Sequence, residues 1–341
     1  MRTLMICLLT LMILPTRPYA QAPPEKTLDV YFVDVEGGHA TLYVSPSGQS
    51  MLVDAGYAGF AGRDADRIVA AATSAGVKQI DYLVITHYHG DHFGGVSQLA
   101  ERLPIRNFVD HGASSDRGER AVADFQTYAQ ARSKGTHLEV KPGDRIPVEG
   151  LTVQVLSAGG GLLSVPLEGG GTPNPLCAAF TPMEDEKSED ARSVGTLVTH
   201  GKFRLINLGD LSWNQEYGLV CPTNRIGTVD VLLASQHGDD EAGSATYVHA
   251  LRPKVGIMGN GARKAAIQPV IQTMRSSPGI QDLWQLHTSQ LGNKQNVPDQ
   301  FIANIGEVDT GHWLKVSART DGSFSVTNGR DGYTKTYPAA N

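Results

Sequence analysis

The chain has 341 residues, of which 40% are hydrophobic and 19% are charged. This is an ordinary globular composition, and it supports one large hydrophobic core or two merged halves. The 29 Lys and Arg residues against 35 Asp and Glu residues give a formal net charge of −6. An acidic chain argues against a stable complex with long nucleic acid, because such binding depends on basic side chains that displace counterions.

The first twenty residues differ in kind from the rest. Arg2 gives a positive start, residues 4–14 form a largely apolar run, and Pro18-Tyr19-Ala20 offers a small residue before a cleavage point. This order predicts a secretory signal peptide over residues 1–20. The apolar run is too short for a permanent transmembrane helix. We therefore expect a secreted or periplasmic protein that has no membrane anchor after signal cleavage.

The remainder of the chain, residues 27–341, opens with segments that alternate between strand and helix patterns. Strands are indicated by short apolar runs rich in β-branched and aromatic residues, bounded by Gly and Pro. Helices are indicated by apolar residues spaced three and four apart. The expected elements of this first half are strands at residues 28–35, 51–53 and 80–86 and helices at residues 61–75 and 93–103.

A β-rich stretch at residues 138–156 is followed by a Gly- and Pro-rich insertion at residues 157–192. The insertion contains two runs of three glycines and an acidic run. So long a connection inside a compact domain is usually a functional loop or disordered. We expect it to form a flap over a functional site.

The second half again alternates between strand and helix patterns, and it ends in β-structure. Its expected elements are strands at residues 195–199, 203–208, 229–234 and 255–258 and helices at residues 242–251 and 265–274. Residues 313–318 and 324–327 flank Asp321-Gly322, which predicts a C-terminal β-hairpin extension. Antiparallel strands mixed with βα units predict a single α+β domain in which sheet packs on sheet and helices cover both outer faces.

Two cysteines lie outside the predicted leader, Cys177 and Cys221. In an oxidising compartment they can form a disulfide, and two separate buried thiols are the alternative. The sequence leaves this choice open.

Four potential metal ligands fall within six residues: His87, His89, Asp91 and His92. Imidazole and carboxylate ligands suit zinc, and they also suit manganese or iron. Residues two apart in an extended segment point the same way, so His87 and His89 can reach one ion together. Asp91 and His92 follow where the chain turns into a helix, and they can reach a second position a few ångströms away. The run is a specific motif, and it predicts one or two bound metal ions.

Two later residues occupy matching places in the pattern. Asp210 and His237 each follow a predicted buried strand, as His87 does. Loops at the same ends of neighbouring strands converge in space, which is where sites in such architectures collect. We therefore expect both residues to join the metal ligands. For Asp210, a turn carboxylate that caps a backbone amide is the alternative.

In this combination the chain resembles the metallo-β-lactamase superfamily, and within it the soluble hydrolase domain of ComEC-type DNA-uptake competence proteins. The segments that carry the resemblance are residues 33–40 (VDVEGGHA), 52–56 (LVDAG) and 86–95 (THYHGDHFGG). The resemblance extends over residues 28–260, and the 157–192 insertion matches poorly. It implies the four-layer αββα sandwich of this superfamily.

The resemblance also implies a ligand set. The ligands are His87 and His89 for a first ion, Asp91, His92 and His237 for a second, and Asp210 as a bridge between the two. Asp54 resembles a carboxylate that orients the metal-binding loop from behind the ligands. Zinc is the implied metal, as one or two ions.

One ligand that the superfamily usually has is missing. A further histidine for the first ion ordinarily precedes the hairpin that leads to Asp210, and this chain reads DARSV at residues 190–194. Ser193 and His111, which follows a predicted strand, are the neighbours that could complete the first site. His39 lies in a turn where the family often carries an acidic residue, and it is a candidate for lining the cleft.

The chemistry that follows is metal-dependent hydrolysis. A hydroxide bound to one or two such ions is a nucleophile near neutral pH, since the metal lowers the pKa of water from about 15.7 toward 7. Asp91 is the residue expected to orient this hydroxide and to accept its proton. We predict an exported hydrolase that acts on a phosphodiester or nucleic-acid-type substrate, either a small molecule or an oligonucleotide. A lactone or β-lactam hydrolase of the same fold is the alternative.

A third hypothesis is a non-catalytic metal-binding protein that has lost one metal site, and the missing histidine motivates it. This hypothesis predicts at most one ion per chain and no hydrolysis. Arg192, Arg263 and Lys264 are candidates for holding a substrate anion, with solvated surface charges as the alternative. The sequence leaves open the substrate, the metal identity and the oligomeric state.

Overall fold

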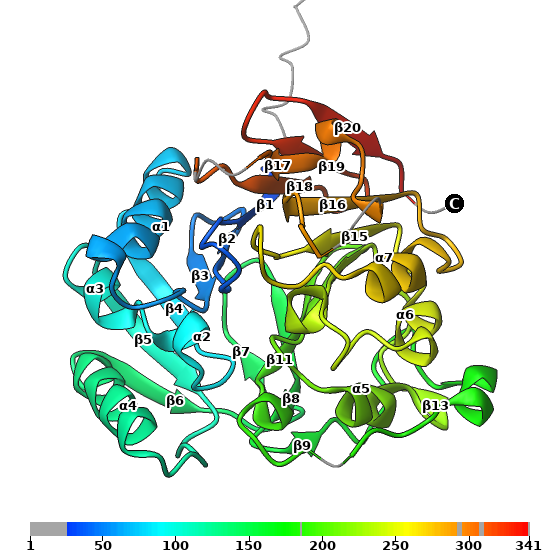
Figure 1. The fold of residues 1–341 in the computed structure, drawn as a ribbon, viewed down its shortest axis with the longest axis horizontal. Helices are drawn as coiled ribbons and strands as arrows, with labels where there is room; N and C mark the ends of the chain where they lie inside the picture. The colour runs from blue at the N-terminus through cyan, green and yellow to red at the C-terminus, as the bar shows by residue number, and fades with distance from the viewer. Residues whose placement is uncertain (1–25, 185, 292–294, 307–309, 340–341) are drawn as a thin grey trace, which may run out of the picture.

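Two large β-sheets form the centre of the molecule in a computed structural model of the chain (Figure 1). The structure describes residues 26–184, 186–291, 295–306 and 310–339. The signal peptide predicted over residues 1–20 lies outside the described residues. Within the described part of the chain, no helix is both long enough and apolar enough to cross a membrane.

The first sheet joins the two ends of the described chain. Its strand order is β20-β19-β18-β1-β2-β3-β4-β5-β6. The strands are β1 (Leu28–Phe32), β2 (Thr41–Val44), β3 (Ser50–Val53), β4 (Ile80–Val84), β5 (Ile105–Asp110), β6 (Thr136–Glu139), β18 (Leu314–Ala318), β19 (Phe324–Asn328) and β20 (Thr334–Tyr337). Because β1 pairs antiparallel with β18, the predicted C-terminal hairpin is part of this sheet, and β20 adds a further strand to it.

The second sheet has the order β17-β16-β15-β14-β12-β11-β8-β7, and β9 pairs with β8 outside this path. Its strands are β7 (Arg145–Ile146), β8 (Thr152–Ala158), β9 (Gly161–Leu162), β11 (Gly195–His200), β12 (Phe203–Asn207), β14 (Val231–Leu233), β15 (Val255–Met258), β16 (Asp282–His287) and β17 (Ile302–Asn304). The strands from β12 to β17 pair in parallel. A separate small sheet pairs β10 (Thr172–Pro173) with β13 (Thr223–Asn224).

The helices lie on the outer side of each sheet (Figure 1). They are α1 (Arg63–Ser74), α2 (Gly90–Phe93), α3 (Val96–Ala100), α4 (Glu119–Arg132), α5 (Trp213–Val220), α6 (Ala245–Leu251) and α7 (Gln268–Arg275), together with the short 3-10 helices η1 (Phe60–Gly62), η2 (Pro175–Ala179), η3 (Asp190–Arg192), η4 (Ser235–Gly238) and η6 (Asp299–Phe301). The single helix expected over residues 93–103 was wrong, because Gly94 and Gly95 separate α2 from α3. A Cβ atom on Gly95 would lie 2.1 Å from the carbonyl oxygen of Ala55, so only glycine allows this approach of the two loops.

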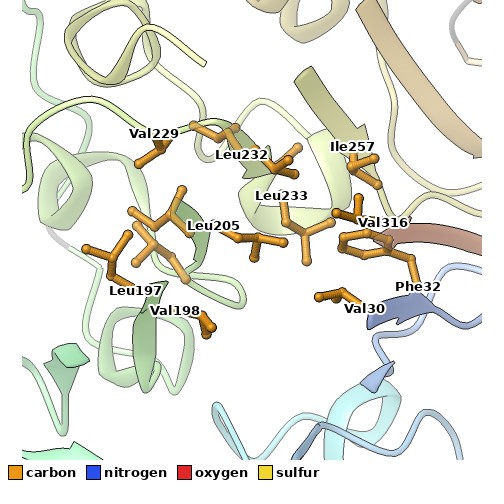
Figure 2. Close-up of a cluster of buried hydrophobic side chains, with 14 of the residues drawn as sticks. Val30, Phe32, Leu197, Val198, Leu205, Val229, Leu232, Leu233, Ile257 and Val316 are labelled. Atoms are coloured by element: carbon orange, nitrogen blue, oxygen red, sulfur yellow. The ribbon is translucent and has the colours of Figure 1, made fainter. Parts of the chain in front are cut away.

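The alternation of side chains along β1 shows how the layers form. Val30 and Phe32 are fully buried in the cluster between the sheets, where Figure 2 places them near Leu233, Ile257 and other apolar residues of the second sheet. Tyr31 points to the opposite face, into the cluster that includes the buried side of α1. Such a period of two is what a strand buried on both faces requires. The predicted four-layer αββα sandwich is confirmed.

The insertion at residues 157–192 packs along α5. A disulfide between Cys177 and Cys221 ties it to the end of that helix, with the two Cα atoms 5.8 Å apart. Phe180 stacks on Tyr217 of α5 with ring centres 4.1 Å apart. The segment around Met183 forms one wall of a cavity of about 460 Å³. The insertion is therefore a side wall held against α5, and it ends in η3.

Candidate metal centre

The loops that follow the parallel strands of both sheets gather at one edge of the sandwich. The loop after β4 carries residues 86–92, the loop after β12 carries Asp210, and η4 after β14 carries His237. In mixed α/β architectures the carboxyl ends of parallel strands are the usual place for a site. The fold thus brings together side chains that lie up to 150 residues apart in the sequence.

A first group of three ligand atoms consists of His87, His89 and Asp190. Asp190 Oδ1 lies 3.0 Å from His87 Nε2 and 2.8 Å from His89 Nδ1. Within the described residues, His87 Nε2 and Asp190 Oδ1 are buried and have no well-aligned hydrogen bond, although they lie close to each other. Buried polar atoms are almost always satisfied, and exceptions point to a ligand or an ion. The ligand atoms of His87, His89 and Asp190 all lie within 4.8 Å of one another, which is close enough to share one cation.

Asp190 is the third member of the first group, and neither Ser193 nor His111 belongs to it. Ser193 Oγ lies 3.3 Å from His87 Nδ1, on the ring edge away from the ligand atom Nε2. His111 Nε2 pairs with Glu189 Oε2 at 3.0 Å, and His111 does not belong to the group. The sequence predicted Ser193 or His111 as the neighbour that completes the first site, and the geometry of the described residues groups Asp190 with His87 and His89 instead. Ser193 contacts the ring of His87, and His111 contacts Glu189, the residue before Asp190.

Glu189 fixes the backbone that presents Asp190. Its side chain is fully buried and accepts hydrogen bonds from the Ser115 hydroxyl at 2.6 Å and from His111. It also accepts a hydrogen bond from the backbone N–H of Tyr88 at 3.3 Å, inside the metal-binding loop. Burial alone would raise the pKa of Glu189, but the donors from His111 and Ser115 lower it to about 2. Glu189 therefore remains a carboxylate that ties three loops together.

A second group of ligand atoms combines Asp91, His92, Asp210 and His237. Asp210 Oδ2 lies 3.2 Å from His92 Nε2 and 3.3 Å from His237 Nε2. Asp91 Oδ2 lies 3.4 Å from His237 Nε2. The rings of His87 and His92 are 4.1 Å apart at their centres, so the two groups are adjacent. Asp210 lies in the second group, and the described geometry does not place it in the first, where it was expected as a bridge.

Asp54 anchors this arrangement from behind. It is fully buried, and its Oδ2 accepts hydrogen bonds from His39 Nδ1 at 2.8 Å, His92 Nδ1 at 2.7 Å and the Thr86 hydroxyl at 2.7 Å. With its Nδ1 proton held by Asp54, His92 turns an Nε2 lone pair toward the second group. His39 lies beside the ligands, with its ring stacked on His92 at 5.6 Å. It contacts Asp54 and is buried, so it supports the ligands and does not line an open cleft.

The carboxylates and histidines of the second group shift one another's pKa values. Burial would raise the pKa of Asp91, but His92, His237 and Lys264 hold it well below its ordinary value. Burial would lower the pKa of His92, but the charges of Asp210, Asp91 and Asp54 raise it well above its ordinary value. Both shifts arise because carboxylates and histidines are crowded together in a buried space, where a bound metal ion would also offset the carboxylate charge.

The turn that presents His237 is strained. Gln236 and His237 both have left-handed backbone angles, with φ of 51° and 56°. Gln236 Nε2 donates to the backbone oxygen of Asp210 at 2.9 Å, which joins the two ligand loops. Non-glycine residues hold such angles only where the surroundings impose them, and these positions cluster at functional sites.

A buried carboxyl group lies below this turn. Glu216 of α5 is fully buried, and its Oε2 accepts the backbone N–H of Gly243 at 2.7 Å. Burial raises its pKa to about 8 from an ordinary value of 4.5. The folded state therefore holds a proton that the unfolded state releases between about pH 4.5 and 8, so this group costs stability as the pH rises through that window.

We expect the variant Glu216→Gln to gain stability relative to the natural protein as the pH rises from 5 to 8. The slope of this difference is at most about 1.4 kcal/mol per pH unit, because a single proton is involved. Urea unfolding at pH 5 and pH 8 measures it, with the exposed Glu101→Gln as the control. A stability difference that is the same at both pH values would contradict the buried, protonated Glu216.

The donor sets of both groups fit divalent metal ions. Imidazole nitrogens and carboxylate oxygens are the ligands of zinc, manganese and iron sites in proteins. Sequence reasoning assembled six of these ligands but missed Asp190 and its support Glu189. A chemical signal for Asp190 was present in the sequence. The segment 190–194, where the further histidine of the first site was expected, begins with this carboxylate, and carboxylates bind the same metals as histidine.

Comparison with known proteins agrees with this geometry. Residues 33–185 match the family model of the metallo-β-lactamase superfamily. The match includes the metal-binding loop and indicates a metallo-β-lactamase superfamily domain in this part of the chain.

Several known proteins are similar to the chain. Hydroxyacylglutathione hydrolase of Rhodopseudomonas palustris is 34% identical over 97 residues, which cover 28% of this chain and 31% of the relative. ComE operon protein 3 of Bacillus subtilis is 26% identical over 193 residues, covering 55% of this chain and 21% of that protein. The matches thus span less than a third of these curated relatives. Among solved structures, the metallo-β-lactamase fold protein YhfI of Bacillus subtilis aligns with 76% of this chain and 96% of its own, at a TM-score of 0.46 and 12% identity.

Proposed function

We propose that this protein is a hydrolase that uses two adjacent divalent metal ions. The observation that carries the proposal is the pair of ligand groups, His87, His89 and Asp190 beside Asp91, His92, Asp210 and His237. The adjacency of the groups, with the rings of His87 and His92 at 4.1 Å, supports two ions that act on one substrate. Completion of the first group by Asp190 weighs against a protein that has lost one metal site.

Divalent ions in these positions would lower the pKa of a water molecule and stabilise negative charge that develops on a substrate oxygen. The residues of the chain do the rest. Asp54 and Thr86 hold the ligand ring of His92 in one orientation. Asp91, a carboxylate of the second group, would orient the attacking water and accept its proton.

A small phosphodiester is the substrate class that we propose first. The resemblance to the competence-type hydrolase domain supports phosphodiester chemistry. The surroundings argue for a small substrate, because the cavity between the insertion and the start of α5 is lined by the acidic side chains of Glu184, Glu186 and Glu241. A long nucleic-acid strand would be repelled there.

Hydrolysis of a carboxylic ester, lactone or β-lactam is the second candidate. It is supported by similarity to proteins named hydroxyacylglutathione hydrolase, which are 33% and 34% identical to this chain over 97 residues. The same metal positions serve both reactions, since each develops negative charge on an oxygen.

The test is a substrate screen with metal-depleted protein and with protein reloaded with zinc or manganese. We expect hydrolysis of an aryl phosphodiester by the reloaded protein and at least a hundredfold lower rate after chelation. Turnover of only a lactone or a chromogenic β-lactam would reject the phosphodiester proposal in favour of the second candidate. Two bound ions without turnover of any of these substrates would reject the hydrolase.

We further propose that the protein acts in the periplasm or outside the cell, as the leader pattern at residues 1–20 predicts. The disulfide between Cys177 and Cys221 supports this proposal, because disulfides persist mainly in oxidising compartments. Mass spectrometry of the protein from its native source tests it. A mature chain that begins near residue 21 is expected, and a cytoplasmic chain with an intact leader would contradict it.

A further inference from the structure

A lysine stands at the rim of the second ligand group. Lys264 lies on the loop that follows β15, and its ammonium group contacts the carboxylate of Asp91. It also lies 5.9 Å from the centre of the Tyr57 ring. The side chain is 37% exposed, so part of this cation faces solvent beside the metal centre.

The loop that carries Lys264 is held in one shape. Ala265 and Ala266 have φ of 62° and 47°, in the left-handed region that alanine rarely adopts. The backbones of Gly261 and Lys264 form an isolated β-bridge. A Cβ atom on Gly37 would lie only 3.1 Å from the Cβ of Lys264, so the two loops interlock. Backbone strain that the surroundings impose marks positions whose geometry matters for function.

Charge balance of the metal centre does not require this lysine. The two ligand groups contain three carboxylates, Asp91, Asp190 and Asp210, and their histidines bind metal in the neutral form. Two divalent ions carry four positive charges, which these three carboxylates and the nearby carboxylate of Asp54 offset. The ammonium of Lys264 is a further positive charge, and a negative charge on the substrate would pair with it.

The space beside Lys264 suits such a group. A cavity of about 340 Å³ is lined by Lys264, Arg263, Tyr57, Gln290, Ala262 and Glu36. The cavity between the insertion and the start of α5 is instead lined by Glu184, Glu186 and Glu241. The cavity at Lys264 is lined by two cationic side chains and one carboxylate, so an anionic group of a substrate is favoured there over the acidic cavity.

We propose that Lys264 and the adjoining cavity form a subsite for one anionic oxygen group of the substrate, either the unreacting oxygen of a phosphodiester or a carboxylate near a scissile ester. This inference rests on the proposed hydrolase function and adds the substrate charge to it. Lys264 then determines specificity by binding the anion directly, while Asp91 keeps its place in the metal centre.

The experiment compares the natural protein with Lys264→Met, Lys264→Arg and the exposed control Lys134→Met. Two matched substrates are used: methyl 4-nitrophenyl phosphate, which is anionic, and dimethyl 4-nitrophenyl phosphate, which is neutral. 4-Nitrophenyl hydrogen succinate and 4-nitrophenyl acetate form the corresponding ester pair. In parallel, calorimetry measures the affinity of each metal-loaded protein for phenylphosphonate.

We expect Lys264→Met to lower the anionic-to-neutral ratio of kcat/KM by about tenfold or more, mainly through KM, because a charge-assisted hydrogen bond is lost. Lys264→Arg should retain most of the ratio, and Lys134→Met should leave it unchanged. Phenylphosphonate affinity should fall by a similar factor in Lys264→Met. If the ratio falls for the phosphate pair, the subsite binds a phosphodiester oxygen. If it falls for the succinate and acetate pair, the subsite binds a carboxylate.

Equal loss for anionic and neutral substrates would overturn the subsite, because it would mean that Lys264 acts through Asp91. Unchanged phenylphosphonate affinity in Lys264→Met would also overturn it. Absence of turnover by the natural protein would instead reject the proposed hydrolase, and the phenylphosphonate measurement would still decide whether the anion subsite exists.

Discussion

Replacing Asp190 with alanine is expected to lower the rate of hydrolysis at least about a hundredfold and to reduce the bound metal from two ions to one per chain. Asp190 Oδ1 lies within 3.0 Å of the ligand atoms of His87 and His89, and no other described side chain joins that group. Loss of a residue that merely supports a ligand costs about 10–100-fold, so loss of a ligand should cost more. Metal analysis of the purified variant and steady-state rates measure the two effects.

Two companion variants make this result specific. Asp190→His restores the histidine that the superfamily usually has, and we expect it to keep a second ion and part of the activity. Asp124→Ala removes an exposed carboxylate on α4, 50% exposed at its side chain, and should change nothing. A full complement of two ions in Asp190→Ala would show that the first site is completed by some other group.

Replacing Asp54 with alanine is expected to destabilise the fold by about 3–5 kcal/mol and to weaken metal binding at least tenfold. Asp54 accepts the Nδ1 protons of His39 and His92, and it also accepts the backbone N–H and the hydroxyl of Thr86. Removing it leaves these buried donors without an acceptor and frees the His92 ring to turn. Urea unfolding and a metal titration with a competing chelator measure the two losses.

The matched control is Asp81→Asn on β4. Asp81 is also a buried carboxylate that accepts a backbone hydrogen bond, from Ser50 N at 2.9 Å, but it lies at the opposite end of the strand from the metal-binding loop. We expect this variant to lose stability without losing metal affinity. If Asp54→Ala and Asp81→Asn lose stability alike and both keep their metal, Asp54 serves the fold alone.

The sequence predicted the elements of the fold well where the pattern is local. The strand expected at residues 80–86 is β4, and the helix expected at residues 61–75 is α1. The pairing of β18 with β1 could not be predicted, because partner choice between distant strands depends on the whole sheet. The split between α2 and α3 depends equally on a distant contact, the approach of Ala55 to Gly95.

The same distinction holds for the candidate site. His87, His89, Asp91 and His92 are marked by spacing, and Asp210 and His237 by their positions after strands. Asp190 has no such mark, because it ends a Gly- and Pro-rich segment without periodicity. Its position is imposed by contacts of Glu189 with Ser115, His111 and the metal-binding loop. Only the folded chain brings that carboxylate to His87.

The most direct test is a crystal structure of the metal-loaded protein with anomalous diffraction measured at the metal edge. Two anomalous peaks are expected. One should lie among His87 Nε2, His89 Nδ1 and the Asp190 carboxylate, and the other among Asp91, His92, Asp210 and His237. A single peak at the second group, with Asp190 turned away from His87, would contradict the two-metal centre.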